Sequence, residues 1–150
     1  MQLKKILVAI DGSENSFHVL DFTLDLAEKF SSSVTILNVA EVLPLSVVPQ
    51  ESANYSVSST AAFAKDIRKI HEDILSKAVS HAKTAKPDVA VSSELREGDA
   101  ASEIVNVAKD DKFDIIVIGH KASSRVSERF LGSVSEKVAH LSPFPVIIVK

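Results

Sequence analysis

The fold is indicated first by a stretch near the amino terminus, which reads ILVAIDGS over residues 6–13. Its apolar part runs on without alternation and is rich in β-branched side chains. Strands of this kind are usually buried on both faces of a parallel sheet. Three further stretches share this character, over residues 34–39, 115–118 and 146–149, and a fifth, over residues 89–95, mixes polar and apolar side chains as a strand near a sheet edge does.

Helical patterns lie between these strands. Apolar residues recur at steps of three and four over residues 17–27, 63–78, 104–108 and 134–141. The order β-α-β-α-β-α-β-α-β predicts an α/β fold, with a doubly wound, five-stranded parallel sheet and helices on both faces. We expect residues 1–150 to form one domain, because this length is common for a single compact domain.

The composition excludes several classes of function. The chain has no cysteine, which removes disulfides, thiol catalysis and cysteine-ligated metals. Its formal net charge is -3 without a basic block, and only 5% of its residues are aromatic, so we expect no nucleic-acid partner. No apolar run approaches the roughly 20 residues of a membrane span, and we therefore expect a cytoplasmic protein with no membrane partner.

One predicted connection is unusually long. Residues 41–60 begin with an apolar segment that contains two prolines and continue as a serine-rich one. Loops of this length in compact domains are usually lids, binding loops or disordered segments. We weigh two interpretations equally, a lid over a ligand and a loop that packs on a partner subunit.

The placement of the four glycines predicts a ligand site. Each follows a predicted strand or precedes the last helix: Gly12, Gly98, Gly119 and Gly132. In open α/β sheets, ligands bind outside the carboxyl ends of the strands. Ser133 and Glu136 have capping-box spacing, so we expect a helix to begin there with free N–H groups that are suited to phosphate. Tight turns and an ordinary capped helix are the alternative interpretation.

At this point the residues resemble the universal stress protein (UspA-like) family, over essentially all of residues 1–150. The family's ATP-binding pattern is Gly-x2-Gly-x9-Gly-(Ser/Thr), and here Gly119 takes the first position and Gly132-Ser133 the last pair. Ala122 stands where the second glycine is expected, which adds a methyl group near the phosphates and disfavours a left-handed backbone. Neither a Walker A loop nor a dinucleotide fingerprint is present.

The resemblance implies a role for each matching residue. Asp11 would contact the nucleoside and a metal-bound water. Ala9 would lie beneath adenine, where many relatives have proline, and the backbone of Val39 would meet adenine. The residues implied around the ribose and phosphates are Gly119, His120, Ala122, Gly132, Ser133, Val134 and Ser135. The hydroxyls of Ser133 and Ser135 are expected to add donors, and Lys121 and Arg125 to add charge. A Mg or Mn ion would bridge the phosphates. For Asp11 the alternative is a helix N-cap ahead of Phe17.

The last strand predicts a partner. Val146 to Val149 are apolar on both faces, and the resemblance places this strand at the edge of the sheet. An exposed apolar edge is an aggregation hazard unless it is covered. The simplest cover is the same strand of a second copy across a two-fold axis, so we expect a homodimer.

Taken together, the residues and the resemblance predict a cytosolic stress-response protein that binds ATP. Its lid or partner surface is expected to differ between the ATP-bound and the ATP-free protein. Two alternatives remain open. One is a slow metal-dependent ATPase that uses Asp11, ranked lower because the motif offers no placed general base or arginine. The other is a dimeric adaptor without nucleotide, favoured if Ala122 closes the site.

Overall fold

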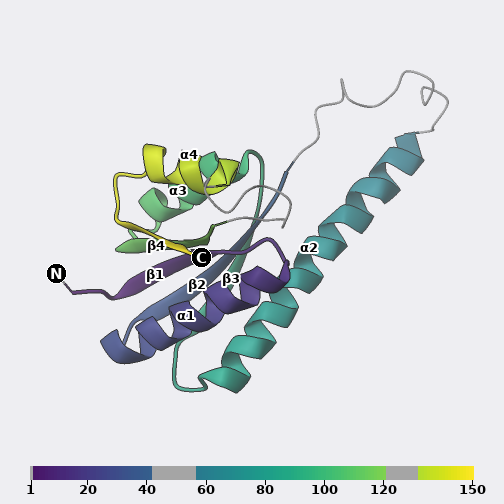
Figure 1. The fold of residues 1–150 in the computed structure, drawn as a ribbon. Coiled ribbons are helices and arrows are strands. Elements are labelled where there is room, and N and C mark those ends of the chain that lie inside the picture. Colours follow the sequence, from purple (N-terminus) through teal and green to yellow (C-terminus); the bar gives the residue numbers. More distant parts are fainter. Residues whose placement is uncertain (1, 42–56, 121–131) are drawn as a thin grey trace.

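The computed structural model describes residues 2–41, 57–120 and 132–150. Strands and helices alternate along this part of the chain, as the sequence predicted (Figure 1). The elements are β1 (Lys5–Ala9), α1 (Glu14–Phe30), β2 (Ser33–Ala40), α2 (Val57–Ala85), β3 (Val91–Glu97), α3 (Ala100–Asp110), β4 (Ile115–Gly119), α4 (Ser133–Leu141) and β5 (Val146–Val149). The predicted α/β fold with a five-stranded parallel sheet is confirmed.

The strand order places a switch point beside the central strand. The order is β3-β2-β1-β4-β5, and all four neighbouring pairs are parallel. The chain first moves outward from β1 to β3 and then crosses to β4 on the other side of β1. Ala9, near the end of β1, is in register with Leu37 of β2 and with Ile118 of β4. A crevice at the carboxyl ends of β1 and β4 is therefore the expected ligand position in this topology.

Helices cover both faces of the sheet. Figure 1 shows α1 and α2 on one face and α3 and α4 on the other. Alternate residues of β1 enter the two cores, since Ile6 and Val8 pack with the α1 and α2 side and Leu7 and Ala9 with the opposite side. This burial on both faces is the reason that the strand sequences are continuously apolar.

The second helix is longer than the sequence predicted. It begins at Val57, so the last four residues of the predicted long connection are helical, and residues 42–56 lie outside the described residues. Its amino-terminal half projects past the sheet, where Phe63 is 62% and Ile70 58% exposed (Figure 1). In the other half, Leu75 and Ala78 are buried against the core. Among the described helices, none is long and apolar enough to cross a membrane.

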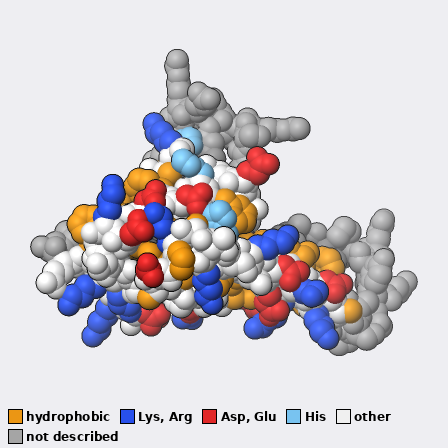
Figure 2. Space-filling model, turned by 90° about the horizontal axis from the view of Figure 1, so that it is seen from below, with side chains coloured by type: hydrophobic (Ala, Val, Ile, Leu, Met, Phe, Trp, Pro, Cys, Tyr) orange, Lys and Arg blue, Asp and Glu red, His pale blue; other side chains and the backbone are white. Residues whose placement is uncertain are grey.

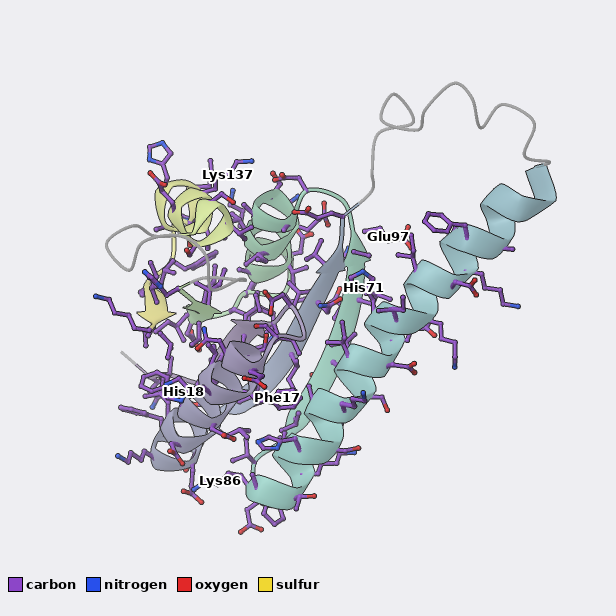
Figure 3. The ribbon with its side chains drawn as sticks, turned by 45° about the vertical axis from the view of Figure 1, so that its right-hand side comes forward. Phe17, His18, His71, Lys86, Glu97 and Lys137 are labelled. Atoms are coloured by element: carbon purple, nitrogen blue, oxygen red, sulfur yellow. The ribbon has the colours of Figure 1, made fainter. Side chains whose placement is uncertain are left out.

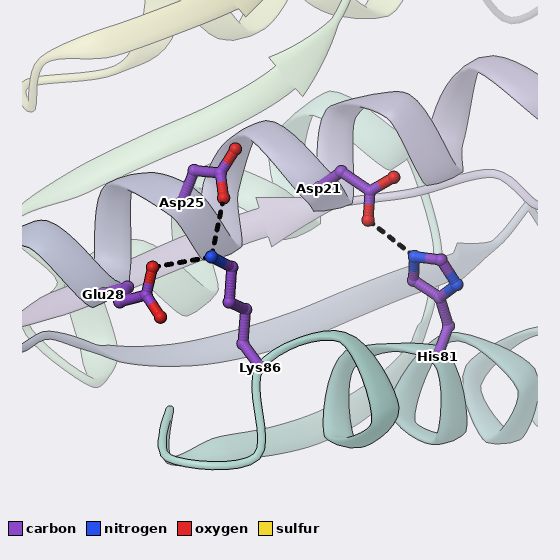
Figure 4. Close-up of polar contacts among 5 residues, drawn as sticks. All are labelled: Asp21, Asp25, Glu28, His81 and Lys86. Carbon is purple, nitrogen blue, oxygen red and sulfur yellow. Dashed lines mark hydrogen bonds and ion pairs between the residues drawn. The ribbon is translucent and has the colours of Figure 1, made fainter.

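Polar contacts join α1 to the end of α2 (Figure 4). Lys86 Nζ lies 3.1 Å from Asp25 Oδ1 and 2.6 Å from Glu28 Oε2. The hydrogen bond to Glu28, and then that to Asp25, raises the pKa of Lys86. His81 Nε2 lies 2.6 Å from Asp21 Oδ1.

Acidic and basic side chains are interspersed over the face shown in Figure 2.

Candidate functional site

A cleft lies at the carboxyl ends of the central strands, at the switch point of the sheet. Its volume among the described residues is about 720 Å³, within the usual range for small-molecule sites. Nine of the ten residues that the sequence analysis selected line it: Ala9, Asp11, Val39, Gly119, His120, Gly132, Ser133, Val134 and Ser135. The tenth, Ala122, lies outside the described residues, as do Lys121 and Arg125. The contribution of each residue to ligand binding stays a prediction.

Asp11 organises the turn between β1 and α1. Its Oδ1 accepts a hydrogen bond from Ser16 Oγ at 2.6 Å and from the backbone N–H of Ser13 at 3.0 Å. The backbone N–H of Asp11 in turn donates to Ser16 Oγ at 3.1 Å. The N-cap of α1 is Ser13, so the alternative interpretation of Asp11 as the N-cap is wrong. Within the described residues, every hydrogen bond to this carboxylate reaches Oδ1, which leaves Oδ2 without a hydrogen-bond partner there.

Gly119 allows the end of β4 to approach α1 closely. A Cβ atom at this position would lie 3.1 Å from Asn15 Nδ2 and 3.2 Å from Val19 Cγ2. Both distances are shorter than ordinary van der Waals contacts, so packing alone favours glycine here. Asn15 and Val19 also line the cleft. The glycine that the family pattern places against the ribose and phosphates therefore also serves helix packing.

Hydrogen bonds join the end of β4 to the start of α4. The N–H of Gly132 donates to His120 O at 2.9 Å, and the N–H of His120 donates to Val149 O at 2.8 Å. Ser135 Oγ, which is buried, lies 3.1 Å from His120 O and 3.0 Å from Gly132 O. The hydroxyl hydrogen of Ser135 therefore serves the backbone, and the backbone N–H of this residue is the donor left for a ligand.

The start of α4 differs by one residue from the predicted capping box. Gly132, not Ser133, is the N-cap, and it makes no side-chain cap hydrogen bond. The first N–H that bonds back along the helix is that of Glu136, which donates to Gly132 O at 2.9 Å. The N–H groups of residues 133–135 precede this bond and have no acceptor within the helix. Together with the positive end of the helix dipole, they suit an anionic group.

Eleven further residues line the cleft and were not selected from the sequence: Ile10, Ser13, Asn15, Ser16, Val19, Leu37, Glu41, His71, Ala100, Ile104 and Ile118. His71 reaches the cleft from α2, on the side of that helix that faces the sheet (Figure 3). Its Nδ1 lies 2.5 Å from Asn38 Oδ1, and Asn38 Nδ2 donates to Ile10 O at 2.8 Å. No spacing rule could connect a helix residue to a strand residue 33 positions earlier.

The helices beside the cleft are held by a second carboxylate. Asp99 is the N-cap of α3 and accepts hydrogen bonds from Ser102 Oγ at 2.7 Å and Ser102 N at 3.0 Å. It also pairs with Lys137 of α4 at 3.3 Å (Figure 3). The Ser102 hydroxyl, the Ser102 N–H and Lys137 together lower the pKa of Asp99. This ion pair between exposed side chains links α3 to α4, whose buried residues share one core.

Comparison with known proteins identifies the family. Residues 2–150 match the model of the universal stress protein family. The chain is 36% identical over 148 residues to universal stress protein YxiE of Bacillus subtilis, covering 97% of this chain and 98% of that protein. The solved structure of protein MJ0577, from Methanocaldococcus jannaschii, is 27% identical with a TM-score of 0.76, covering 100% of this chain and 97% of that one. A universal stress protein from Archaeoglobus fulgidus in complex with dAMP is 24% identical with a TM-score of 0.66, covering 100% of both chains. The chain therefore belongs to the universal stress protein family.

Proposed function

We propose that this protein binds ATP in the cleft at the carboxyl ends of the strands and acts in the cytoplasmic stress response through nucleotide-dependent contacts with partners. One observation carries the proposal. The free N–H groups at the start of α4 line the same cleft as Asp11 of the β1–α1 turn and Gly119 of β4. A donor set suited to phosphate and a carboxylate suited to a ribose hydroxyl thus line one site.

The expected arrangement of the nucleotide follows from these donors and acceptors. The phosphates would accept hydrogen bonds from the N–H groups of residues 133–135, while adenine would lie over Ala9 and meet the backbone of Val39. Asp11 Oδ1 is already engaged by Ser16 and Ser13. We therefore expect a ribose hydroxyl to donate to Oδ2.

The same cleft suits a Mg or Mn ion that is carried by the phosphates. Such cations prefer oxygen ligands and are commonly held by one or two carboxylates together with substrate phosphates. Asp11 and Glu41 are the two carboxylates among the described lining residues. Asp11, on the β1–α1 turn, is the residue that we expect to face the metal-bound water. The ion would neutralise phosphate charge and so strengthen binding beside these carboxylates.

Support for an adenine nucleotide comes from the family. The Archaeoglobus member was solved with dAMP, which is an adenine nucleotide. This chain keeps the Gly-Ser pair of the family's ATP-binding pattern at Gly132 and Ser133. In the structure that pair forms the N-cap and first residue of α4, where the N–H groups without an acceptor in the helix begin.

We also propose a homodimer through β5. Val146–Val149 is an edge strand, paired only with β4 among the described strands. Three of its four apolar side chains, at positions 146–148, are only partly buried in the single chain. A second β5, antiparallel across a two-fold axis, would pair the open backbone edge and cover these side chains.

Calorimetry with the purified protein tests the proposed ligand. Bound nucleotide is first extracted and identified by mass spectrometry, and the emptied protein is then titrated with ATP, AMP and GTP in the presence of Mg²⁺. We expect saturable binding of ATP, weaker binding of AMP and weakest binding of GTP. If the titrations release no heat and no nucleotide is extracted, the dimeric adaptor without nucleotide is favoured instead. Release of phosphate that Asp11→Ala abolishes would favour the ATPase.

A further inference from the structure

We infer that His71 is a specificity-determining residue of the cleft, whose Nε2 presents a hydrogen-bond acceptor that selects a ligand with an N–H or O–H donor at that end. Asn38 is the positioning residue that holds the imidazole in the required tautomer. The inference rests on the proposed function, because it concerns what the same cleft selects. On an adenine nucleotide the available donors are the exocyclic amine of the base and the ribose hydroxyls.

The orientation of the Asn38 side chain is fixed by its buried surroundings. Only 1% of Asn38 is exposed, and its Nδ2 donates to Ile10 O at 2.8 Å. The flipped amide would instead place Oδ1 against that carbonyl oxygen, so two acceptors would meet without a hydrogen. Such an unsatisfied buried pair costs about 1 to 3 kcal/mol. Asn38 Oδ1 is therefore the atom that faces His71.

This orientation decides which ring nitrogen of His71 carries the hydrogen. Asn38 Oδ1 can only accept, and His71 Nδ1 lies 2.5 Å from it, so Nδ1 must donate. In the neutral imidazole, Nε2 then has no hydrogen and is an acceptor. The two nitrogens diverge across the five-membered ring, so Nε2 is directed away from Asn38. His71 is also one of the residues that line the cleft, and the proposal places this acceptor there.

A fixed acceptor in a partly buried cleft discriminates between ligands more sharply than an apolar wall does. A ligand with a donor at this end satisfies Nε2, whereas a ligand with a carbonyl oxygen or a hydrogen there leaves the acceptor unpaired. Sites built for a hydrogen bond reject the analogue that lacks the partner, because the buried polar group is then unsatisfied. Asn38 cannot reorient to compensate, since Ile10 O holds it in place.

Two substitutions separate the two nitrogens of the ring. His71→Asn places an amide near the Nδ1 position and keeps a donor for Asn38, but it removes the group at Nε2. His71→Gln places an acceptor near the Nε2 position and gives up the Nδ1 contact. If His71 serves only the contact between α2 and β2, ATP affinity should be kept in His71→Asn and lowered in His71→Gln. A ligand-selecting role would show the opposite order.

The experiment measures affinities of the unchanged protein and both variants by calorimetry, with thermal unfolding as a check that each is folded. The ligands are ATP, purine riboside triphosphate (which lacks the amine), 2′-deoxy-ATP and 3′-deoxy-ATP. We expect His71→Asn to weaken ATP binding about tenfold and His71→Gln to restore it to within about threefold. In the unchanged protein, the analogue that lacks the selected donor should bind about tenfold more weakly than ATP. In His71→Asn, the same analogue should bind as tightly as ATP. The analogue that behaves in this way identifies the amine or one of the hydroxyls as the donor.

Three outcomes would overturn the inference. His71→Asn binding ATP as the unchanged protein does would show that Nε2 makes no ligand contact. An equal loss for all four ligands in His71→Asn would show a structural effect without selection. If the unchanged protein binds ATP, either result leaves the proposed function standing. If the unchanged protein binds no adenine nucleotide at all, the proposed function and this inference fail together.

Discussion

The backbone N–H of Gly132 donates a hydrogen bond to the carbonyl oxygen of His120 at 2.9 Å. This bond joins the residue that follows β4 to the N-cap of α4. Ser135 Oγ reinforces it by lying within hydrogen-bonding distance of both carbonyl oxygens, those of His120 and Gly132. The start of α4 is thereby held against the end of the sheet, so its free N–H groups are pre-positioned before a ligand arrives.

We predict that Gly132→Val abolishes nucleotide binding while leaving the fold and the dimer intact. The backbone at Gly132 has φ -64° and ψ 154°, a conformation that any L-residue adopts, so the substitution adds no backbone strain. The branched side chain instead enters the cleft that Gly132 lines, where the phosphates are expected. Calorimetry with ATP measures the loss, and light scattering after size exclusion measures the oligomeric state.

Gly132→Ala is the matched control for this prediction. It also removes the glycine N-cap but adds only a methyl group, so we expect a smaller loss of affinity than valine causes. A loss of about 0.5 to 1 kcal/mol in the free energy of unfolding is expected for both variants, since neither residue caps a helix well. Unchanged ATP affinity in the valine variant would show that the phosphates lie elsewhere.

We predict that Gly119→Ala lowers the free energy of unfolding by about 1 kcal/mol, because an inserted methyl group must displace closely packed neighbours. Its nearest neighbour would be Asn15 Nδ2, at 3.1 Å. Asn15→Ala removes that neighbour, so the double variant should lose less stability than the sum of the two single variants. Urea unfolding of all four proteins measures the coupling. Strictly additive losses would show that Asn15 does not limit the space at Gly119.

The sheet could be predicted from the sequence because its signals are local. The continuous apolar stretch of β1 reflects burial under helices on both faces, and the polar positions of β3 reflect its place at the edge. The place of residues 119–120 and 132–135 in the cleft was predictable because the turn after β4 and the start of α4 carry the family pattern within 15 residues.

Other parts of the site depend on contacts between distant elements. His71 and Asn15 line the cleft only because α2 and α1 pack against the sheet in particular registers. Two helix starts also differ from what the sequence indicated. The N-cap of α1 is Ser13 and not Asp11, the alternative interpretation, and Asp11 Oδ1 accepts a hydrogen bond from Ser16 Oγ. The N-cap of α4 is Gly132 and not Ser133, with no side-chain cap hydrogen bond.

We predict that Ile148→Pro dissociates the proposed dimer without unfolding the protein. Pro145 O, just before β5, and Val149 O, at its end, accept hydrogen bonds from Ile116 N and His120 N. Because backbone groups alternate in direction along a strand, the odd-numbered residues face β4 and the N–H of Ile148 faces the open edge. Among the backbone hydrogen-bonding groups, proline at 148 removes only that outward donor, although it also shortens a side chain that packs on the α3 and α4 side. Ile147→Pro, the matched control, removes a donor to β4 and should destabilise the fold. A stable dimer of Ile148→Pro would exclude β5 pairing.

We predict that Asp114 contributes stability that disappears at acid pH. Its Oδ2 accepts hydrogen bonds from the backbone N–H groups of Lys5 and Lys4, both at 2.8 Å, which fasten the start of β1 beside β4. These bonds, first that of Lys5 and then that of Lys4, lower the pKa of Asp114 in the folded protein.

The sign of the effect follows from that lowered pKa. As pH falls, Asp114 of the unfolded chain takes up a proton first, near the ordinary carboxyl pKa of about 3.9. The stabilisation is therefore complete above that pH and is lost as pH falls through the lower pKa of Asp114 in the folded protein. Asp114→Asn should therefore cost about 1 kcal/mol at pH 7 and progressively less toward pH 2, measured by urea unfolding across this range. Asp88→Asn, at an exposed carboxylate in the turn before β3, is the control and should change stability little at any pH. An equal cost for Asp114→Asn at pH 7 and pH 2 would show that the charge of Asp114 does not stabilise the start of β1.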